Sequence, residues 1–231
     1  MAESEVKLLG VWASPFVIRT RIALNLKNVN YAFLQDNMAA KSELLLKSNP
    51  VYKKVPVLIH GDKPICESLI IVQYIDDIWT SGPSILPSHP YDRATARFWA
   101  AFLDDKWYPA TRVIDDAEGE EAKKAAVDQA VEILVLLEEA FKKCSRGKPF
   151  FGGDQIGYLD IVFGSFLGWL RARETIYDIK LLRQAKTPDL VKWAEKFLQH
   201  PAVIGAMPEQ EKVTEFARVI LARMKAANPP K

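Results

Sequence analysis

Apolar residues in the first eighty positions follow the patterns of both strands and helices. Residues 6–11 form a short apolar run with β-branched ends, which predicts a buried strand. Ile18, Ile22 and Leu26 then recur every fourth residue, which predicts a helix with one buried face. Residues 31–34 predict a second strand. The beginning of the chain is therefore expected to form a β-α-β unit with two parallel strands.

The next stretch, residues 49–68, reads NPVYKKVPVLIHGDKPICES and combines two strand patterns with a turn signal at Gly61-Asp62. A strongly apolar segment follows and completes a small α/β domain. The elements predicted here are a short helix or turn at residues 41–47, strands at 57–59 and 63–66, and a helix at 69–79.

The composition changes between Thr80 and Pro90, where the sequence SGPSILPSHP holds three prolines and a glycine. This segment predicts a linker at residues 81–91, between a domain at residues 1–80 and an all-helical domain at residues 92–231. The helices predicted for the second domain span residues 92–106, 120–143, 158–174, 188–199 and 209–224.

Composition excludes several classes of function. The chain of 231 residues has a formal net charge of +2 and no basic tract, which disfavours nucleic acid as a partner. No apolar run approaches the length of a membrane span, and the first residues lack the apolar core of a signal peptide. Cys66 and Cys144 form no CxxC pattern, and the three histidines have no ligand spacing, so that no metal site is expected. Reduced thiols fit a cytoplasmic protein.

Polar residues at the junctions of residues 49–68 suit a small, extended, charged ligand. If the Val55–Pro56 bond is cis, the backbone groups of Val55 face outward and can pair with another backbone. Ser68 is a good N-cap beside free helix amides that favour a carboxylate, Glu67 suits an ammonium group, and Lys54 suits an anion. Taken alone, these residues favour a plainer interpretation, namely a hairpin and a capped helix with solvated lysines.

Ser14 follows the first predicted strand, with Pro15 at the first helical position. A hydroxyl there lies at the positive end of the helix dipole and can donate a hydrogen bond to an anion. If that anion is a thiolate, its formation is favoured, because cysteine pKa values fall from about 8.5 in such settings. The plainer interpretation is an ordinary N-cap. No base lies near Ser14 in the sequence, so a serine nucleophile has no support.

Large side chains on the predicted helices are candidates for an apolar ligand site between the domains. Tyr108, Arg112, Trp169 and Phe216 are the candidates, although aromatic residues on helices mostly belong to the core. Asp160, in the first turn of the most apolar helix, indicates a structural acid. Three pairs of adjacent aspartates indicate solvated surface rather than paired catalytic acids: residues 76–77, 104–105 and 115–116.

Four segments carry a resemblance that extends over essentially the whole chain: WASPF at 12–16, NPVYKKVPVLIH at 49–60, PICESLIIVQYID at 64–76 and GGDQIGYLDI at 152–161. Through them the chain resembles a glutathione S-transferase, and most closely the tau class of plants. The resemblance implies an α/β thioredoxin-like N-terminal domain and an all-α helical C-terminal domain. It also implies a homodimer.

The resemblance implies a role for each site residue. Ser14 would be catalytic and donate its hydrogen bond to the glutathione thiolate. Besides Ser14 at the sulfur, the resemblance implies three groups of glutathione contacts. Lys41 and Lys54 would bind the glycyl carboxylate, with Asn49 nearby. Val55, before a cis Pro56, would pair with the cysteinyl unit, and Glu67 with Ser68 would hold the γ-glutamyl end. The implied acceptor site consists of Phe16, Tyr108, Arg112, Trp169 and Phe216.

The implied function is a glutathione transferase of detoxification and stress response. It would join glutathione, a co-substrate, to a hydrophobic electrophile, with no prosthetic group. The electrophile would be an aryl halide, an activated alkene or an organic hydroperoxide, the last giving peroxidase activity. Cysteine-type relatives carry Cys in place of Ser14, so reductase activity is not expected. Gly157 stands where relatives often have Ser or Thr, so the capping box there is only partly present.

Two other functions remain open. The chain could be a non-catalytic carrier (ligandin) of hydrophobic metabolites, or a purely structural interaction domain. A carrier needs no thiolate site, so the presence of Ser14, Lys54 and Glu67 together favours the enzyme. Replacing Ser14 by Ala distinguishes them, because a carrier would keep its ligand affinity.

Overall fold

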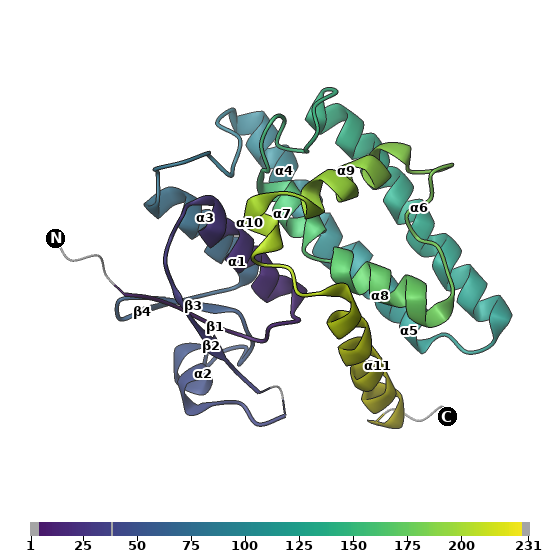
Figure 1. Ribbon diagram of the computed structural model, residues 1–231, viewed down its shortest axis with the longest axis horizontal. Coiled ribbons are helices and arrows are strands. Elements are labelled where there is room, and N and C mark those ends of the chain that lie inside the picture. Colours follow the sequence, from purple (N-terminus) through teal and green to yellow (C-terminus); the bar gives the residue numbers. More distant parts are fainter. Residues whose placement is uncertain (1–4, 38, 228–231) are drawn as a thin grey trace.

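The computed structural model describes residues 5–37 and 39–227, and the outermost residues of both predicted domains lie outside these ranges. The N-terminal part is a four-stranded sheet with helices on both faces (Figure 1). The strand order is β2-β1-β3-β4, in which β1 is parallel to β2 and antiparallel to β3, and β3 is antiparallel to β4. The elements are β1 (Val6–Gly10), α1 (Pro15–Leu26), β2 (Ala32–Gln35), α2 (Glu43–Ser48), β3 (Val57–His60), β4 (Lys63–Cys66) and α3 (Ser68–Ile78).

The two faces of the sheet are covered by different helices. Because successive strand residues point to opposite faces, neighbouring leucines of β1 enter different cores. Leu8 packs into the core formed with α1 and α3, whereas Leu9 packs with Leu45 of α2. The predicted β-α-β unit, hairpin and following helix are confirmed, and so is the α/β class of this part.

The rest of the chain is helical, as predicted (Figure 1). The elements are α4 (Pro90–Phe102), the π-helical turn η1 (Leu103–Trp107), α5 (Tyr108–Asp116), α6 (Glu120–Ser145), α7 (Tyr158–Gly164), α8 (Leu167–Tyr177), α9 (Pro188–Leu198), α10 (Pro201–Ile204) and α11 (Gln210–Ala227).

Two of the predicted helices differ from the structure. The segment 158–174 was expected as one helix but is divided into α7 and α8 at Ser165 and Phe166. At this break Gly164 lies so close to α9 that an added Cβ would be 2.2 Å from the ring of Phe197. The break is invisible in the hydrophobic pattern because residues on both sides of it are buried.

The helix expected at 92–106 likewise does not stop near Lys106. It passes through η1 and continues as α5, so that α4 and α5 form one interrupted rod. A π-helical turn inserts an extra residue into a helix and is frequent at functional sites. Here it carries Asp104 and delivers Tyr108 at the start of α5.

The three pairs of adjacent aspartates were predicted to be solvated surface. This prediction is wrong for one aspartate of each pair. Asp76, Asp104 and Asp115 each form an ion pair with a basic residue distant in sequence, whereas the second member of each pair takes no part in these contacts. The partners and closest N–O distances are Lys27 at 2.7 Å for Asp76, Arg19 at 2.6 Å for Asp104, and Arg173 at 2.7 Å for Asp115.

A single hydrophobic core crosses the boundary between the two parts. It includes Leu8 of the sheet, Ile75 of α3, Ala100 of α4 and Trp193 of α9. The linker is fastened to this body because Asp76 accepts hydrogen bonds from the amides of the adjacent residues 85 and 86, at 2.9 and 2.8 Å. The sheet and the helices therefore hold the residues between them in fixed positions.

Candidate active site

Ser14 presents a hydroxyl at the N-terminus of α1. It is the N-cap residue, with φ −72° and ψ 122°, and its carbonyl accepts from the amide of Ile18 at 3.0 Å. Its half-buried side chain accepts no hydrogen bond from the first turn of the helix. The interpretation as an ordinary side-chain cap is therefore not supported. The hydroxyl can act on another partner at the positive end of the helix dipole.

The loop before β3 carries the predicted backbone contact. The Val55–Pro56 bond is cis, as expected, and Val55 is half-buried. Asn49 is buried and holds the loop together: its Nδ2 donates to the Lys54 carbonyl at 2.9 Å, and its Oδ1 accepts from the Tyr52 amide at 3.1 Å. The carboxamide of Asn49 thus has an internal role in shaping the loop that presents Lys54.

Lys41 and Lys54 both have exposed side chains, and neither forms an ion pair with another described residue. Lys41 precedes Ser42, the N-cap of α2. The Ser42 hydroxyl donates to buried Asp36 at 2.6 Å and accepts from the Leu45 amide at 3.1 Å. The Ser42–Asp36 pair, which the sequence pattern did not indicate, fixes the position of the backbone beside Lys41.

The N-terminus of α3 differs from the prediction by one residue. Glu67, not Ser68, is the N-cap, and it is exposed in the left-handed region with φ 69°. A non-glycine residue held there costs about 1–3 kcal/mol, and such strain is concentrated at ligand sites. Ser68 is buried as the first residue of the helix, and its hydroxyl accepts from Arg19 at 3.1 Å.

Arg19 is fully buried between the two parts of the molecule. Its guanidinium forms a two-pronged contact with Asp104 at 3.0 and 2.6 Å, and it also reaches Ser68. The sequence pattern did not indicate Arg19, since both partners are distant along the chain. The contact joins the N-terminus of α3 to the π-helical turn, and so connects both domains beside Glu67.

Of the predicted acceptor residues, Phe16 and Tyr108 contact each other. Their ring centroids lie 5.3 Å apart, nearly perpendicular. Phe166, at the break between α7 and α8, completes the group, with its ring 5.8 Å from Phe16 and 5.9 Å from Tyr108. Phe166 was not predicted, because nothing in its apolar surroundings distinguishes it from core.

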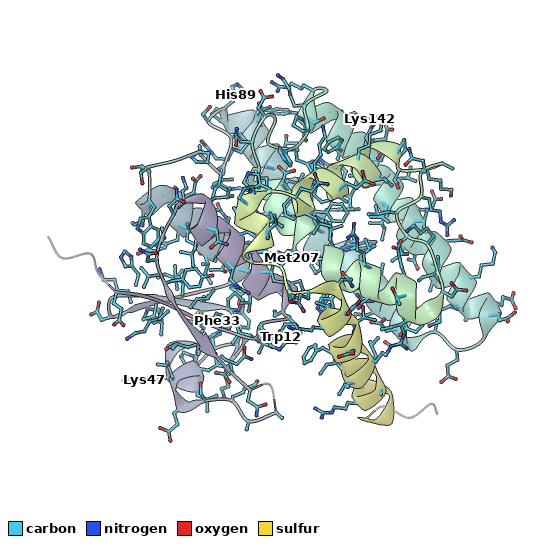
Figure 2. The ribbon with its side chains drawn as sticks, in the orientation of Figure 1. Trp12, Phe33, Lys47, His89, Lys142 and Met207 are labelled. Carbon is cyan, nitrogen blue, oxygen red and sulfur yellow. The ribbon has the colours of Figure 1, made fainter. Side chains whose placement is uncertain are left out.

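Trp169 and Phe216 form a second aromatic group with Trp12, which lies where the sheet domain faces α11 (Figure 2). The Phe216 ring is 5.2 Å from Trp12 and 6.3 Å from Trp169. The indole N–H of Trp169 donates to the carbonyl of Ala13 at 2.7 Å. The two aromatic groups therefore reach the chain on either side of Ser14, at Ala13 and at Phe16.

Arg112 lies one turn after Tyr108 on α5, so that the two share a helix face. Its NH1 donates to the sulfur of Met224 on α11 at 3.1 Å and lies 3.6 Å from Asp115. Arg112 thus places a charged group beside otherwise aromatic acceptor candidates.

Other reactive groups are scarce in the described part of the chain. Cys66 is half-buried, and burial together with the nearby charge of Glu67 raises the pKa of its thiol, so that it is not primed as a nucleophile. Among residues 5–37 and 39–227, no group of three or more His, Cys, Asp or Glu side chains is placed to hold a metal ion. No helix in these ranges is both long and apolar enough to cross a membrane.

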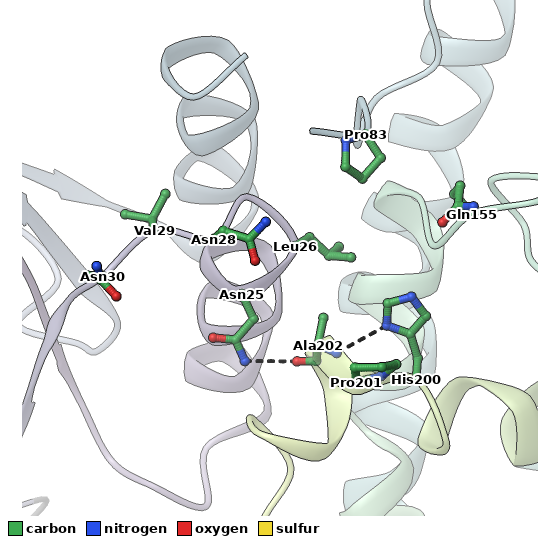
Figure 3. A pocket seen from close by; sticks show the side chains of 10 residues that line it. All are labelled: Asn25, Leu26, Asn28, Val29, Asn30, Pro83, Gln155, His200, Pro201 and Ala202. Atoms are coloured by element: carbon green, nitrogen blue, oxygen red, sulfur yellow. Dashed lines mark hydrogen bonds between the residues drawn. The ribbon is translucent and has the colours of Figure 1, made fainter. Parts of the chain in front are cut away.

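Two surface hollows lie elsewhere. One of about 530 Å³ is lined by amide side chains near the C-terminal end of α1, where Asn25 donates to the Ala202 carbonyl and the Ala202 amide donates to His200 (Figure 3). The other, of about 370 Å³, adjoins it and includes His60 and Trp79. Neither hollow contains a residue predicted for the glutathione or acceptor site.

Comparisons with known proteins identify the family of the chain. The model of the glutathione S-transferase N-terminal domain matches residues 4–77, and that of the C-terminal domain matches residues 98–201. Glutathione S-transferase U18 of Arabidopsis thaliana is 61% identical over 227 residues, which is 98% of this chain and 100% of that protein.

Solved structures show the same similarity. The tau-class glutathione S-transferase of mango, Mangifera indica, is 64% identical, with a TM-score of 0.91 over 94% of this chain and 99% of the other. Rice GST1, solved in complex with glutathione, is 34% identical, with a TM-score of 0.88 over 96% and 99% of the two chains. From the domain matches and from relatives of such identity, the chain belongs to the glutathione S-transferase family, within which it resembles the tau class of plants.

Proposed function

We propose that this chain is a serine-type glutathione transferase, in which Ser14 ionises the glutathione thiol for attack on a hydrophobic electrophile. The observation that carries the proposal is the Ser14 hydroxyl at the N-terminus of α1, which is not used to cap that helix. A hydroxyl that donates to sulfur stabilises the thiolate over the thiol. The helix dipole acts in the same direction, so both lower the thiol pKa.

The remaining groups accommodate the ends of an extended tripeptide. Glu67 would take the γ-glutamyl ammonium, and the free amides at the start of α3 would take its carboxylate. The backbone of Val55 would pair with the cysteinyl unit, and the exposed ammonium groups of Lys41 and Lys54 would attract the glycyl carboxylate. In this proposed order the sulfur would lie between the two ends of the tripeptide and would meet the Ser14 hydroxyl.

The chemistry proposed is nucleophilic attack by the thiolate. With an aryl halide, a carbon–sulfur bond forms and the halide leaves with its bonding electron pair. With an activated alkene, sulfur adds to the alkene and the resulting carbanion takes a proton from water. With an organic hydroperoxide, sulfur attacks oxygen, the O–O bond breaks and the alcohol leaves, after which a second glutathione forms the disulfide and releases water. The aromatic groups around Phe16 and Trp169 would hold the apolar part of the electrophile.

We further propose that the enzyme acts in detoxification and stress response, in the cytoplasm and as a homodimer. Mango and Arabidopsis relatives are named glutathione S-transferases, which supports the activity. The reduced cysteines support the compartment.

The test is the ionisation of bound glutathione, followed as thiolate absorbance against pH. We expect a lowered thiol pKa in the native protein that rises by at least one unit in Ser14→Ala, because the thiolate loses its hydrogen bond. Ser84→Ala is the matched control, since it also removes a hydroxyl, but from the linker, where Ser84 donates to the Leu86 carbonyl. It should leave the thiol pKa unchanged.

Glutathione binding, measured separately by calorimetry, should persist in Ser14→Ala. Binding with an ordinary thiol pKa in both the native protein and the variant would contradict the transferase and leave the carrier. Absence of glutathione binding would leave only a structural interaction domain.

A further inference from the structure

Asp115, near the end of α5, is a buried carboxylate that three side chains approach. Arg173 donates to it through two nitrogens, with Nε 2.9 Å from Oδ1 and NH2 2.7 Å from Oδ2. The Tyr177 hydroxyl donates to Oδ1 at 3.3 Å. Burial and the charge of Asp115 raise the pKa of Tyr177 to about 12, so it remains a neutral donor. Arg112 NH1 lies 3.6 Å from Oδ2, which is an ion-pair distance but too long for a hydrogen bond.

One carboxylate is therefore shared by two guanidinium groups, and the net charge of the three groups together is +1. Arg173 takes the two-pronged contact in the buried position, so the excess charge resides on Arg112, whose side chain is 27% exposed. The other charged groups near Tyr177 are Lys123 over its ring and Asp116, which have opposite signs and leave the sum unchanged.

The donors of Arg112 are only partly used. A guanidinium has five N–H donors in a planar fork, and a thioether sulfur such as that of Met224 is a weak acceptor. Arg112 therefore keeps donors that a carboxylate can accept in a two-pronged contact.

Arg112 also lies at the proposed acceptor site. Tyr108 lies one turn before Arg112 on α5, and its ring contacts Phe16, which follows Ser14 by two residues. On the other side Arg173 lies over the ring of Trp169, with its carbon 5.6 Å from the ring centroid. The same carboxylate thus positions Arg112 and, through Arg173, the Trp169 wall.

We propose that Arg112 anchors an acidic group, so that the preferred electrophiles combine an apolar body with a carboxylate remote from the reacting carbon. This inference rests on the proposed transferase function. It names the acceptor class, which the aromatic residues alone would leave as any apolar compound.

The test uses two electrophiles with the same reacting group, ethacrynic acid and its methyl ester, of which only the acid carries a negative charge. In both, sulfur bonds to the terminal alkene carbon, the alkene electron pair moves to the ketone as an enolate, and water protonates the adjacent carbon. Nothing leaves, and the carboxylate is distant from the reaction. Once the uncatalysed rates are subtracted, we expect kcat/KM of the native protein to be about tenfold higher for the acid, since a charge-assisted contact typically accounts for such a factor.

Three variants separate the role of Arg112 from a general effect of charge. Arg112→Gln should bring the acid-to-ester ratio of kcat/KM close to one, and Arg112→Lys should retain part of the preference because it keeps the charge without the fork. Arg146→Gln removes the same charge from the exposed end of α6, where Arg146 pairs with Asp92, and should keep the full ratio. Circular dichroism confirms that each variant is folded.

A native ratio of one or below, or the same ratio in Arg112→Gln, would overturn the inference. Failure of the proposed function looks different: neither electrophile would be conjugated, and the thiol pKa of bound glutathione would be ordinary. Conjugation of both electrophiles at equal rates would retain the transferase and remove the acidic acceptor.

Discussion

At the scale of single residues, Arg19 places a full positive charge inside the boundary between the sheet and the helices. Asp104 compensates that charge with a two-pronged contact, and the Ser68 hydroxyl uses a further donor. The rings of Phe16 and Phe166 lie 4.9 and 5.0 Å from its guanidinium carbon. A buried charge pair of this kind adds little net stability, but the loss of one partner is costly.

We therefore expect Asp104→Leu to lower the free energy of unfolding by about 3 kcal/mol, since Arg19 would stay buried without a counterion. The double variant Arg19→Met with Asp104→Leu should recover most of that loss, because both charges are gone. Urea unfolding measures both values, and Asp105→Leu on the exposed neighbouring position serves as the control. Equal losses in the single and the double variant would contradict the argument.

Candidate site residues could be recognised in the sequence where their position depends on local backbone. Ser14 and Glu67 stand at strand-to-helix junctions, and such junctions leave a mark in the order of residues. The contacts of Arg19 and Phe166 could not be predicted, because their partners are distant along the chain. An arginine in a helix is also usually expected at the surface. The role of Asn49 was likewise hidden, since only the folded loop shows its carboxamide bonded to backbone.

At the scale of elements, most strands and helices could be predicted to within a few residues, because each has a pattern of its own and a turn signal at its end. The division of 158–174 into α7 and α8 could not, since a buried helix is apolar on all sides and its breaks leave the pattern unchanged. The π-helical turn was hidden for a similar reason: it continues the helical spacing while adding one residue.

The start of α7 shows a local prediction that the structure confirms. Asp160 has a structural role, accepting from the amides of Phe151, Gly152 and Gly157 at 2.8, 2.8 and 2.9 Å, and from the Trp193 indole at 2.7 Å. One carboxylate thereby fixes the turn before α7 and joins it to α9. Burial nevertheless raises the pKa of Asp160 to about 6, against the lowering effect of these donors.

A pH dependence follows from this pKa. An ordinary aspartate has a pKa of about 3.9, so the folded chain binds the proton of Asp160 more tightly than the unfolded chain does. Its contribution to stability therefore grows as the pH falls through 6. We expect the native protein to gain about 1 kcal/mol over Asp160→Asn between pH 7 and pH 5.

Urea unfolding at several pH values gives that difference directly. Asp154→Asn removes an exposed carboxylate from the same loop and should show no comparable trend relative to the native protein. A difference between native protein and Asp160→Asn that is constant from pH 7 to pH 5 would show that the carboxylate titrates below this range.

At the scale of the whole molecule, α3 and α4 present an apolar surface that the described residues leave uncovered. Ile70 of α3 is 55% exposed, and Tyr91 and Phe98 of α4 are 74% and 61% exposed. Gln73 and Arg97 hydrogen-bond at 2.9 Å and hold the two helices side by side. A homodimer would bury this surface against its own copy, since a two-fold interface uses the same residues from both chains. We therefore place the proposed dimer contact here.

Phe98→Arg should convert the dimer into a monomer, because it would bring two like charges together at a desolvated contact. Light scattering coupled to size exclusion measures the mass. Leu136→Arg is the control, since Leu136 is also exposed but lies alone on α6. A native monomer, or a dimer that persists in Phe98→Arg, would contradict this interface.

The ion pair of Arg19 with Asp104 also bears on how such chains can be recombined. Arg19 belongs to the N-terminal sheet domain and Asp104 to the helical domain, with the linker between them. Consider a hybrid that joins residues 1–80 to the helical domain of a relative in which the position of Asp104 holds no acidic residue. Such a hybrid would bury the Arg19 guanidinium between the two domains without a counterion. The two domains can therefore be exchanged between relatives only where the incoming helical domain supplies an acidic partner for Arg19.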